Sequence, residues 1–213
     1  MMLYNENKGV NAMKRSKYLK LKRYLDCLIA VVACLFIWPV FLAICVAIKL
    51  DSKGSIFFTQ KRVGYAGRLF DIYKFRTMYS DTPKDVPTHL LKDPDEYITN
   101  VGAFLRRTSL DELPQLINII KGDMSFVGPR PALWNQYDLI RERSKYGANR
   151  VPPGLTGLAQ ISGRDELEIP EKAALDGKYA KNFGPVMDIK CFFGTFAAVL
   201  KASGVKEGGT GGR

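Results

Sequence analysis

The sequence predicts an α+β protein that is mostly α-helical, built from a membrane-inserted N-terminal helix and a small domain with a β-hairpin. Three observations carry this prediction: one long uncharged apolar segment, two neighbouring strand-like runs, and later segments whose apolar residues recur at helical spacing. A chain of 213 residues suits one domain plus an appendage. We therefore expect a basic polar N-terminal segment, a membrane helix, one folded domain and a flexible tail, at residues 1–21, 22–50, 51–204 and 205–213.

The membrane helix is predicted from the residues between Asp26 and Lys49, none of which is charged. At about 1.5 Å per residue this segment is about 33 Å long, so a simple transmembrane span is one alternative. Two features favour a re-entrant helix instead: Pro39 interrupts the hydrogen-bond ladder near the middle, and basic residues flank both ends. Because basic flanks prefer the cytoplasmic side, a helix that bends at Pro39 and returns satisfies both. The domain that follows is then cytoplasmic.

The domain is predicted to begin with a β-hairpin. Residues 56–63 and 68–75 are rich in aromatic and β-branched side chains and are separated by Gly64–Gly67. Three prolines then mark residues 81–96 as a connector. Helical spacing predicts helices at 95–106, 110–121, 132–145, 168–182 and 188–202. The last of these is compatible with either a buried core helix or an amphipathic helix lying at the membrane interface.

Charge and cysteine usage limit the function classes. The 32 Lys and Arg residues outnumber the 21 Asp and Glu residues, and this surplus suits anionic partners such as phospholipid headgroups or nucleotide phosphates. We find no zinc-finger, helix-turn-helix or RNA-recognition signature, so nucleic acid is not expected as a partner. The four cysteines show no paired spacing that would indicate disulfides or a zinc site. The single histidine, His89, lies in the polar connector, which gives a histidine nucleophile little support.

The most informative motif is Thr108–Gln115, followed about a helix length later by Gly128–Pro131. The first motif contains two adjacent carboxylates, Asp111 and Glu112. Arginines flank these acids in the sequence, namely Arg106, Arg107 and Arg130. A carboxylate pair among arginines is what an enzyme needs to hold a metal ion and attack a phosphate.

The same residues have a purely structural interpretation. Ser109 and Glu112 match a capping box, so the acids could simply begin the helix predicted at 110–121 and interact favourably with its dipole. Pro114 is tolerated only near a helix start, which keeps the acids close to that end. A capping box alone does not require Lys74, Arg76 and the arginines of the neighbouring motifs. The wider context therefore favours a phosphoryl-transfer site.

Four motifs occur here in one order, and together they resemble those of the bacterial sugar transferases, the small monotopic polyprenol-phosphate phosphoglycosyl transferases. The motifs are Lys74–Met78, Arg106–Leu116, Lys121–Pro131 and Pro153–Gln160, and the resemblance covers roughly residues 22–204. It implies a re-entrant membrane helix, a place on the cytoplasmic face of the bacterial inner membrane, and phospholipids as partners. Whether the protein is a homodimer is not decided by these residues.

The resemblance also implies a reaction: transfer of a phosphosugar from a UDP-sugar to undecaprenyl phosphate, with release of UMP. Asp111 matches the family's nucleophile, which would form an aspartyl-phosphosugar intermediate. Glu112 matches the residue that binds Mg²⁺, and Arg106 and Arg130 match phosphate-contacting arginines. Lys74 is expected to assist at the phosphates. The segment after Gly128–Pro131 resembles members that act on N-acetylated amino sugars.

Arg23 and Asp26 fit the family's motif at the point where the chain enters the membrane. Asp26 is expected to pair with an arginine, since an unpaired charge at that depth is costly.

Two alternatives remain beside this interpretation. One is a transferase that binds donor and acceptor together and uses Asp111 only as a metal ligand. The other is a non-catalytic membrane-surface module that binds anionic lipid and whose acids merely cap helices. The first would release no UMP without acceptor, and the second would release none under any condition.

Overall fold

The computed structural model describes residues 2–82, 94–163 and 167–200. His89 and the tail predicted at 205–213 lie outside these residues. The predicted hairpin is confirmed: β1 (Phe57–Val63) pairs antiparallel with β2 (Leu69–Phe75), joined by the 3-10 turn η1 (Tyr65–Gly67). The register sets Phe57 opposite Phe75 and Val63 opposite Leu69. The prediction of a mostly helical α+β protein is also confirmed.

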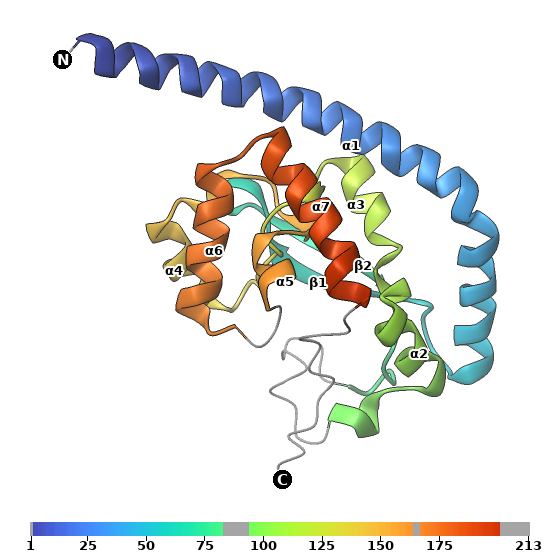
Figure 1. Cartoon of the computed structure of the whole chain (residues 1–213). Helices are drawn as coiled ribbons and strands as arrows, with labels where there is room; N and C mark the ends of the chain where they lie inside the picture. Colours follow the sequence, from blue (N-terminus) through green and yellow to red (C-terminus); the bar gives the residue numbers. More distant parts are fainter. Residues whose placement is uncertain (1, 83–93, 164–166, 201–213) are drawn as a thin grey trace.

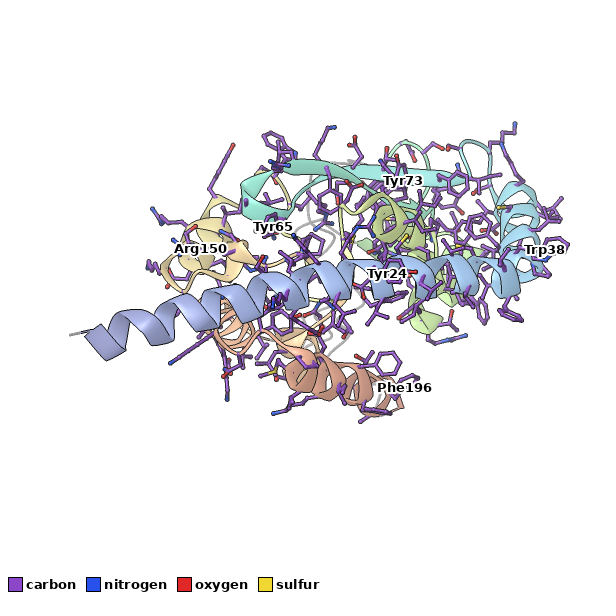
Figure 2. The ribbon with its side chains drawn as sticks, turned by 90° about the horizontal axis from the view of Figure 1, so that it is seen from above. Tyr24, Trp38, Tyr65, Tyr73, Arg150 and Phe196 are labelled. Carbon is purple, nitrogen blue, oxygen red and sulfur yellow. The ribbon has the colours of Figure 1, made fainter. Side chains whose placement is uncertain are left out.

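The first helix, α1 (Met2–Asp51), passes over the domain, bends near Pro39 and turns down beside α2 (Asn100–Thr108), as Figure 1 shows. It runs without interruption through the predicted boundary at residues 21 and 22. Its stretch from Arg15 to Asp51 is the one helix among the described residues that is long and apolar enough to cross a membrane. Much of its apolar surface is exposed: Phe36 is 79% exposed and Trp38, at the bend in Figure 2, is 62% exposed.

The inner side of α1 packs on the domain both before and after the bend. Before it, Ala30 is fully buried in a cluster with β2 and α3 (Gln115–Lys121). After it, Ile44 and Ile48 pack against Phe75 of β2 and Leu105 of α2. Both halves of the apolar segment are therefore attached to one and the same domain.

Two predicted helices begin later than the sequence indicates. The helix expected at 95–106 is a 3-10 turn, η3 (Pro94–Tyr97), followed by α2, because the Thr99 side chain accepts a hydrogen bond from the Gly102 backbone N–H and so caps α2. The helix expected at 132–145 is confirmed only as α4 (Tyr137–Lys145).

The predicted start of the helix at 110–121 is wrong. Ser109 lies in the left-handed region, with φ of 57°, and ends α2 instead of capping a new helix. A 3-10 turn, η4 (Leu110–Glu112), follows, and α3 begins only after Pro114. The capping box does not form, so the structural interpretation of Glu112 as a capping residue loses its basis.

The C-terminal half packs around a short parallel pair of strands that the sequence did not reveal, β3 (Ser125–Val127) and β4 (Gly154–Thr156). A core cluster joins β3 to three helices, α5 (Leu158–Ser162), α6 (Ile169–Lys181) and α7 (Pro185–Leu200). The 3-10 turn η5 (Ala148–Arg150) comes shortly before β4. The helix predicted at 168–182 is thus confirmed as α6. The helix predicted at 188–202 is confirmed up to Leu200 as α7, which begins earlier, at Pro185; residues 201 and 202 lie outside the described residues.

The last helix, α7, combines the two alternatives left open by the sequence. Cys191 is fully buried in the core cluster. Other positions of α7 carry large apolar side chains that are between 47% and 80% exposed, namely Val186, Ile189, Phe192, Phe193 and Phe196. Phe196 points outward in Figure 2. An exposed apolar face of this kind indicates a surface that is covered by something other than water.

Candidate functional site

The two adjacent carboxylates, Asp111 and Glu112, lie in the η4 turn between α2 and α3. The left-handed conformation of Ser109 redirects the chain as α2 ends. Leu110 and Leu113 on either side of the acids then pack against the core cluster below α1. This packing fixes the turn and therefore the place of both carboxylates.

Lys74 is the cation that meets both carboxylates. Its Nζ lies 2.8 Å from Glu112 Oε1 and 3.2 Å from Asp111 Oδ2. Successive side chains of a strand point to opposite faces, so Phe75, which is only 1% exposed, anchors β2 in the core while Lys74 faces the acids. The expectation that Lys74 belongs to this site is supported by its position; its role at the phosphates stays a prediction.

Arg130 approaches Glu112 from the other side, with Nη2 2.8 Å from Oε1. The side chain of Arg130 is 44% exposed, whereas that of Glu112 is 16% exposed. Glu112 therefore lies between two cations that come from different parts of the sequence, and Arg130 is the member of the site that reaches furthest toward solvent.

Two sequence motifs cooperate to position Arg130. The Gly128 N–H donates to the Thr156 carbonyl at 2.8 Å, and the Gly154 N–H donates to the Pro129 carbonyl at 2.9 Å. A Cβ at Gly128 would lie 2.2 Å from the Pro152 carbonyl oxygen, so only glycine permits this approach. The segments Gly128–Pro131 and Pro153–Gln160 are thus structural partners, and their contact holds the backbone on either side of Arg130 in place.

Arg62 is a site residue that the sequence analysis missed. Its Nη1 donates to the Pro131 carbonyl at 3.1 Å and its Nη2 donates to Gln60 Oε1, while its Nε is buried with no partner. Burial and the charge of Arg130 lower the pKa of Arg62 to about 9, against the opposing effect of Glu112. Gln60 is buried on the same strand, and the two-residue period of β1 would have placed Arg62 on that inner face.

The other predicted arginines are placed differently. Arg106, one helical turn before the acids, donates its Nε to the Thr77 hydroxyl at 2.9 Å. The ion pairs of the two carboxylates among the described residues are made by Lys74 and Arg130. Arg76, which the sequence only placed nearby, is buried and donates to the Ser52 and Lys53 carbonyls at the end of α1. Arg76 is thus a structural residue.

The residues expected at the membrane entrance, Arg23 and Asp26, both contact the domain. Arg23 donates to the carbonyls of Ile119 and Ile120 at the end of α3, at 2.7 and 2.5 Å. The sequence suggested that Asp26 pairs with an arginine, but the structure shows other partners. Its Oδ2 lies 3.5 Å from Lys22 Nζ and accepts a hydrogen bond from the Ser125 hydroxyl. Arg23 instead binds the negative end of the α3 dipole.

The electrostatics of the site keep Glu112 ionised. Burial raises the pKa of its carboxyl group, but the charges and hydrogen bonds of Arg130 and Lys74 outweigh burial and leave the pKa well below its ordinary value. Mg²⁺ is commonly held by one or two protein carboxylates together with substrate phosphates. The pair of Asp111 and Glu112 fits that requirement, although in the described parts of the chain no three potential ligands gather.

Comparison with known proteins identifies the family in which this site occurs. The profile described as "Bacterial sugar transferase" matches residues 17–202. The exopolysaccharide production protein ExoY of Rhizobium meliloti is 39% identical over 197 residues, which is 86% of this chain and 87% of that protein. Longer relatives match as well. The undecaprenyl-phosphate glucose phosphotransferase of Komagataeibacter xylinus is 39% identical over 81% of this chain and 34% of its own length.

A third relative, the UDP-N-acetylgalactosamine-undecaprenyl-phosphate N-acetylgalactosaminephosphotransferase of Aeromonas hydrophila, is 36% identical over 95% of this chain and 49% of its own length. The matches include both the α1 segment and the domain that carries Lys74, Asp111, Glu112 and Arg130. Since the family profile extends over nearly the whole chain, this protein belongs to the bacterial sugar transferase family.

Proposed function

We propose that this protein transfers a phosphosugar from a UDP-sugar to undecaprenyl phosphate, releases UMP, and so begins the assembly of a bacterial polysaccharide. The observation that carries the proposal is the geometry of Asp111: a carboxylate 3.2 Å from Lys74, beside a second carboxylate that is itself held by two cations. Relatives named as undecaprenyl-phosphate sugar phosphotransferases support the acceptor and the reaction type.

In the first step, an Asp111 carboxylate oxygen attacks the β-phosphorus of the UDP-sugar. A new P–O bond forms to Asp111 while the bond between the two phosphates breaks, and UMP leaves with the bond's electron pair. In the second step, a phosphate oxygen of undecaprenyl phosphate attacks the same phosphorus and restores the Asp111 carboxylate. Two displacements allow two bulky anions to use one site in turn.

The neighbouring cations support this chemistry. Arg130 is exposed enough to contact a substrate phosphate, and its planar guanidinium matches phosphoryl oxygens. Lys74 lies between the acids, where its charge offsets the repulsion between Asp111 and an incoming diphosphate. Arg106, anchored on Thr77 one turn before the acids, is proposed as a further phosphate contact.

Glu112 is the residue that would hold Mg²⁺, beside the nucleophile Asp111. When bound, the ion would neutralise phosphate charge during the displacement. Because Glu112 is kept ionised by Lys74 and Arg130, its carboxylate is available in the charged form that a metal ligand requires.

The packing of α1 supports a monotopic, re-entrant placement with the domain on the cytoplasmic face. Arg23 and Asp26 bind the domain just before the apolar segment, and Ile44 and Ile48, at the end of that segment and after the bend, pack on the same domain. A straight span would separate these two ends by the thickness of a bilayer. The bend near Pro39 and the exposed apolar surface around it are suited to insertion into one leaflet.

For the donor we propose a UDP-sugar with an N-acetylated amino sugar, as in the relative from Aeromonas hydrophila. The relative from Komagataeibacter xylinus is named as a glucose phosphotransferase, so UDP-glucose is the alternative donor and both sugar classes belong in the test panel.

The proposal is tested by measuring UMP release from detergent-held protein with Mg²⁺ and a panel of UDP-sugars, with and without undecaprenyl phosphate. We expect a stoichiometric burst without acceptor and continuous turnover with acceptor. Asp111→Asn is expected to abolish both. Asp123→Asn is the matched control and should leave both signals unchanged, because among the described residues the Asp123 side chain contacts Asn118 and Lys121 of α3.

Two outcomes would contradict parts of the proposal. Turnover with acceptor but no burst without it would favour a transferase that binds both substrates together. Absence of UMP release with every donor would favour a non-catalytic lipid-binding module.

A further inference from the structure

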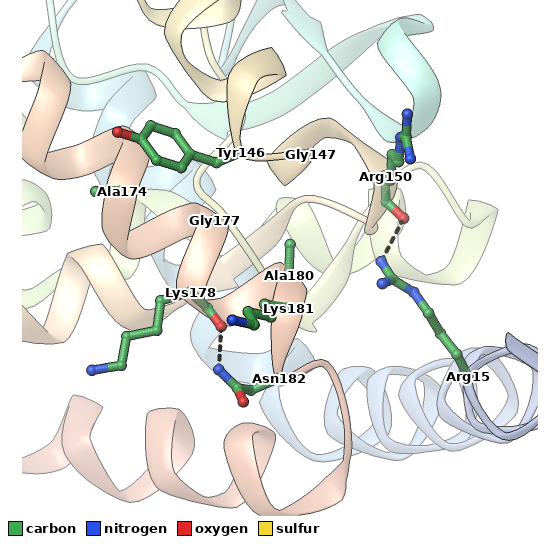
Figure 3. Close-up of a pocket in the computed structure, with 10 residues that line it drawn as sticks. All are labelled: Arg15, Tyr146, Gly147, Arg150, Ala174, Gly177, Lys178, Ala180, Lys181 and Asn182. Carbon is green, nitrogen blue, oxygen red and sulfur yellow. Dashed lines mark hydrogen bonds between the residues drawn. The ribbon is translucent and has the colours of Figure 1, made fainter. Parts of the chain in front are cut away.

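A cavity of about 630 Å³ is lined by residues of α1, of α6 and of the turn after α4. In Figure 1, α4 and α6 lie at the other end of the domain from α2, which the two site carboxylates follow in the chain. The cavity is formed where the N-terminal part of α1 meets the turn after α4 and the end of α6, as Figure 3 shows. Arg15 lines it from α1, Tyr146 and Arg150 from the turn, and Lys178 and Lys181 from α6. None of these residues takes part in the proposed transfer reaction.

The charge around this cavity is strongly unbalanced. Four of the described residues that line it are cations, Arg15, Arg150, Lys178 and Lys181, and no Asp or Glu is among them. Arg15 is held in place, because its Nη2 donates to the Arg150 carbonyl at 3.3 Å and its guanidinium lies 5.6 Å from the centre of the Phe183 ring. In Figure 3 the two lysines come from α6 on the other side of the cavity, with the Lys178 side chain extending away from Arg15. Like charges gathered without an acid favour the binding of an anion.

Exposed apolar side chains follow along α1 and at the start of α7, outside the lining of the cavity. The Tyr18 and Phe183 rings are in edge contact at 5.2 Å, which joins α1 to the segment that leads into α7. Beyond this contact, α1 exposes Leu21 and Tyr24, which are 54% and 68% exposed. On the other side, α7 begins with Val186, which is 80% exposed. A ligand with an anionic head in the cavity and apolar chains long enough to reach these residues would match both. We call these exposed residues of α1 and α7 the apolar rim.

We propose that this cavity binds the phosphate headgroup of an anionic phospholipid, whose acyl chains lie over the apolar residues of α1 and α7. The proposal rests on the membrane placement of these two helices but not on the chemistry of Asp111. A soluble phosphate would use the four cations alone, whereas a lipid would use the apolar rim as well. A bound lipid would tie α1 to α6 where the membrane helix leaves the domain.

The test measures binding of a short-chain phosphatidylglycerol to the full-length protein in detergent. The pocket variant is Arg15→Gln with Lys181→Gln. The matched control is Lys17→Gln with Lys190→Gln, which removes the same charge from exposed positions of α1 and α7 outside the cavity. We expect the pocket variant to bind at least tenfold more weakly and the control to change less than twofold.

Comparison ligands identify what the cavity recognises. Phosphatidylcholine of equal chain length and glycerol phosphate are each expected to bind at least tenfold more weakly than phosphatidylglycerol. Equal binding of phosphatidylcholine would overturn the proposal by showing that only apolar contacts matter. Equal binding of glycerol phosphate would overturn it in favour of a soluble phosphate ligand, and an equal loss in the control variant would show that only net charge matters.

Two further readouts separate this proposal from the others. Flotation with phosphatidylcholine vesicles tests the membrane placement of α1 and α7, and the pocket variant is expected to float as the wild type does. UMP release tests the transfer reaction, and it is expected to persist in the pocket variant. Loss of flotation in the wild type would contradict the membrane placement itself.

Discussion

Two clusters in this protein each place one lysine between two carboxylates, and they differ in how the carboxylate oxygens are satisfied. In the candidate active site, Lys74 lies between Asp111 and Glu112, and the additional partner is the exposed Arg130. At the junction of α1 with the domain, Lys22 lies 2.6 Å from Asp188 and 3.5 Å from Asp26.

The junction cluster is closed by hydroxyl groups. Asp188 accepts hydrogen bonds from the Tyr18 and Tyr179 hydroxyls, both at 2.7 Å, and Asp26 accepts one from Ser125. Burial and the hydrogen bonds to Asp188 raise the pKa of both tyrosines, which therefore remain proton donors. The lysine side chain is 6% exposed.

The comparison shows that the same charged groups serve different purposes according to what surrounds them. Hydroxyl donors and burial satisfy the acids at the junction, so this cluster fixes α1 to β3 and α7. In the candidate active site, the charges of the acids are balanced by Lys74 and Arg130, which can also bind a phosphate. These two cations can therefore transfer their contacts from the carboxylates to a substrate. Removing an acid should therefore cost stability at the junction and activity in the site.

The largest effect on stability is expected for Asp188→Asn, which leaves the buried Lys22 without its closest carboxylate. Removing one partner of a buried ion pair typically costs about 3–5 kcal/mol. Denaturant unfolding in one detergent would measure the loss, and Asp111→Asn is the comparison, expected to change stability by less than about 1 kcal/mol. Equal losses of unfolding free energy in the two variants would show that the two clusters do not differ in their contribution to stability.

The next largest effect is expected for Glu112→Gln, which keeps the shape of the side chain but removes the charge that Lys74 and Arg130 bind. We expect a roughly hundredfold fall in kcat, the size seen when one electrostatic group of an active site is removed. Steady-state UMP release measures it. A variant with normal kcat would show that Glu112 has only a structural role.

A smaller effect is expected for Arg62→Lys, because one ammonium group cannot replace the fork that binds both the Pro131 carbonyl and Gln60. The backbone next to Arg130 would then be held less firmly. We expect kcat to fall roughly tenfold, which corresponds to a rise of about 1.4 kcal/mol in the activation free energy. Lys61→Gln, on the same strand but 56% exposed, is the control and should behave as the wild type does. Equal kcat in both variants would contradict the positioning role of Arg62.

The smallest effect concerns pH. The folded-state pKa of Glu112 is lowered, so the stabilisation from its carboxylate is fully present above the unfolded value of about 4.3 and is lost as the pH falls below it. The difference in melting temperature between the wild type and Glu112→Gln should therefore be constant from about pH 8 to pH 6 and shrink below about pH 4.5. A difference that changes near pH 7 would show that Glu112 is not held ionised.

The parts that the sequence predicted correctly are those that local pattern determines. The hairpin follows from composition and the glycine turn, and α6 and α7 follow from helical spacing. The η4 turn was missed because the capping-box pattern at Ser109 says nothing of its left-handed backbone.

Contacts between distant residues were beyond the same patterns. Lys74 and Glu112 are 38 positions apart, and no local rule brings them within 2.8 Å. The parallel pair β3 and β4 was hidden for a similar reason, since three-residue strands give no periodic signal. The family motifs named Asp111 and Glu112, but only the fold shows that Lys74 lies between them.

The central claim is that Asp111 carries the phosphosugar. The most direct test incubates the protein with donor and no acceptor, quenches it, and maps the mass of the tryptic peptide 108–121. We predict that the adduct has the mass of one phosphosugar, that it is located on Asp111, and that it disappears when undecaprenyl phosphate is added. An adduct on Glu112, or UMP release with no adduct on this peptide, would contradict the account.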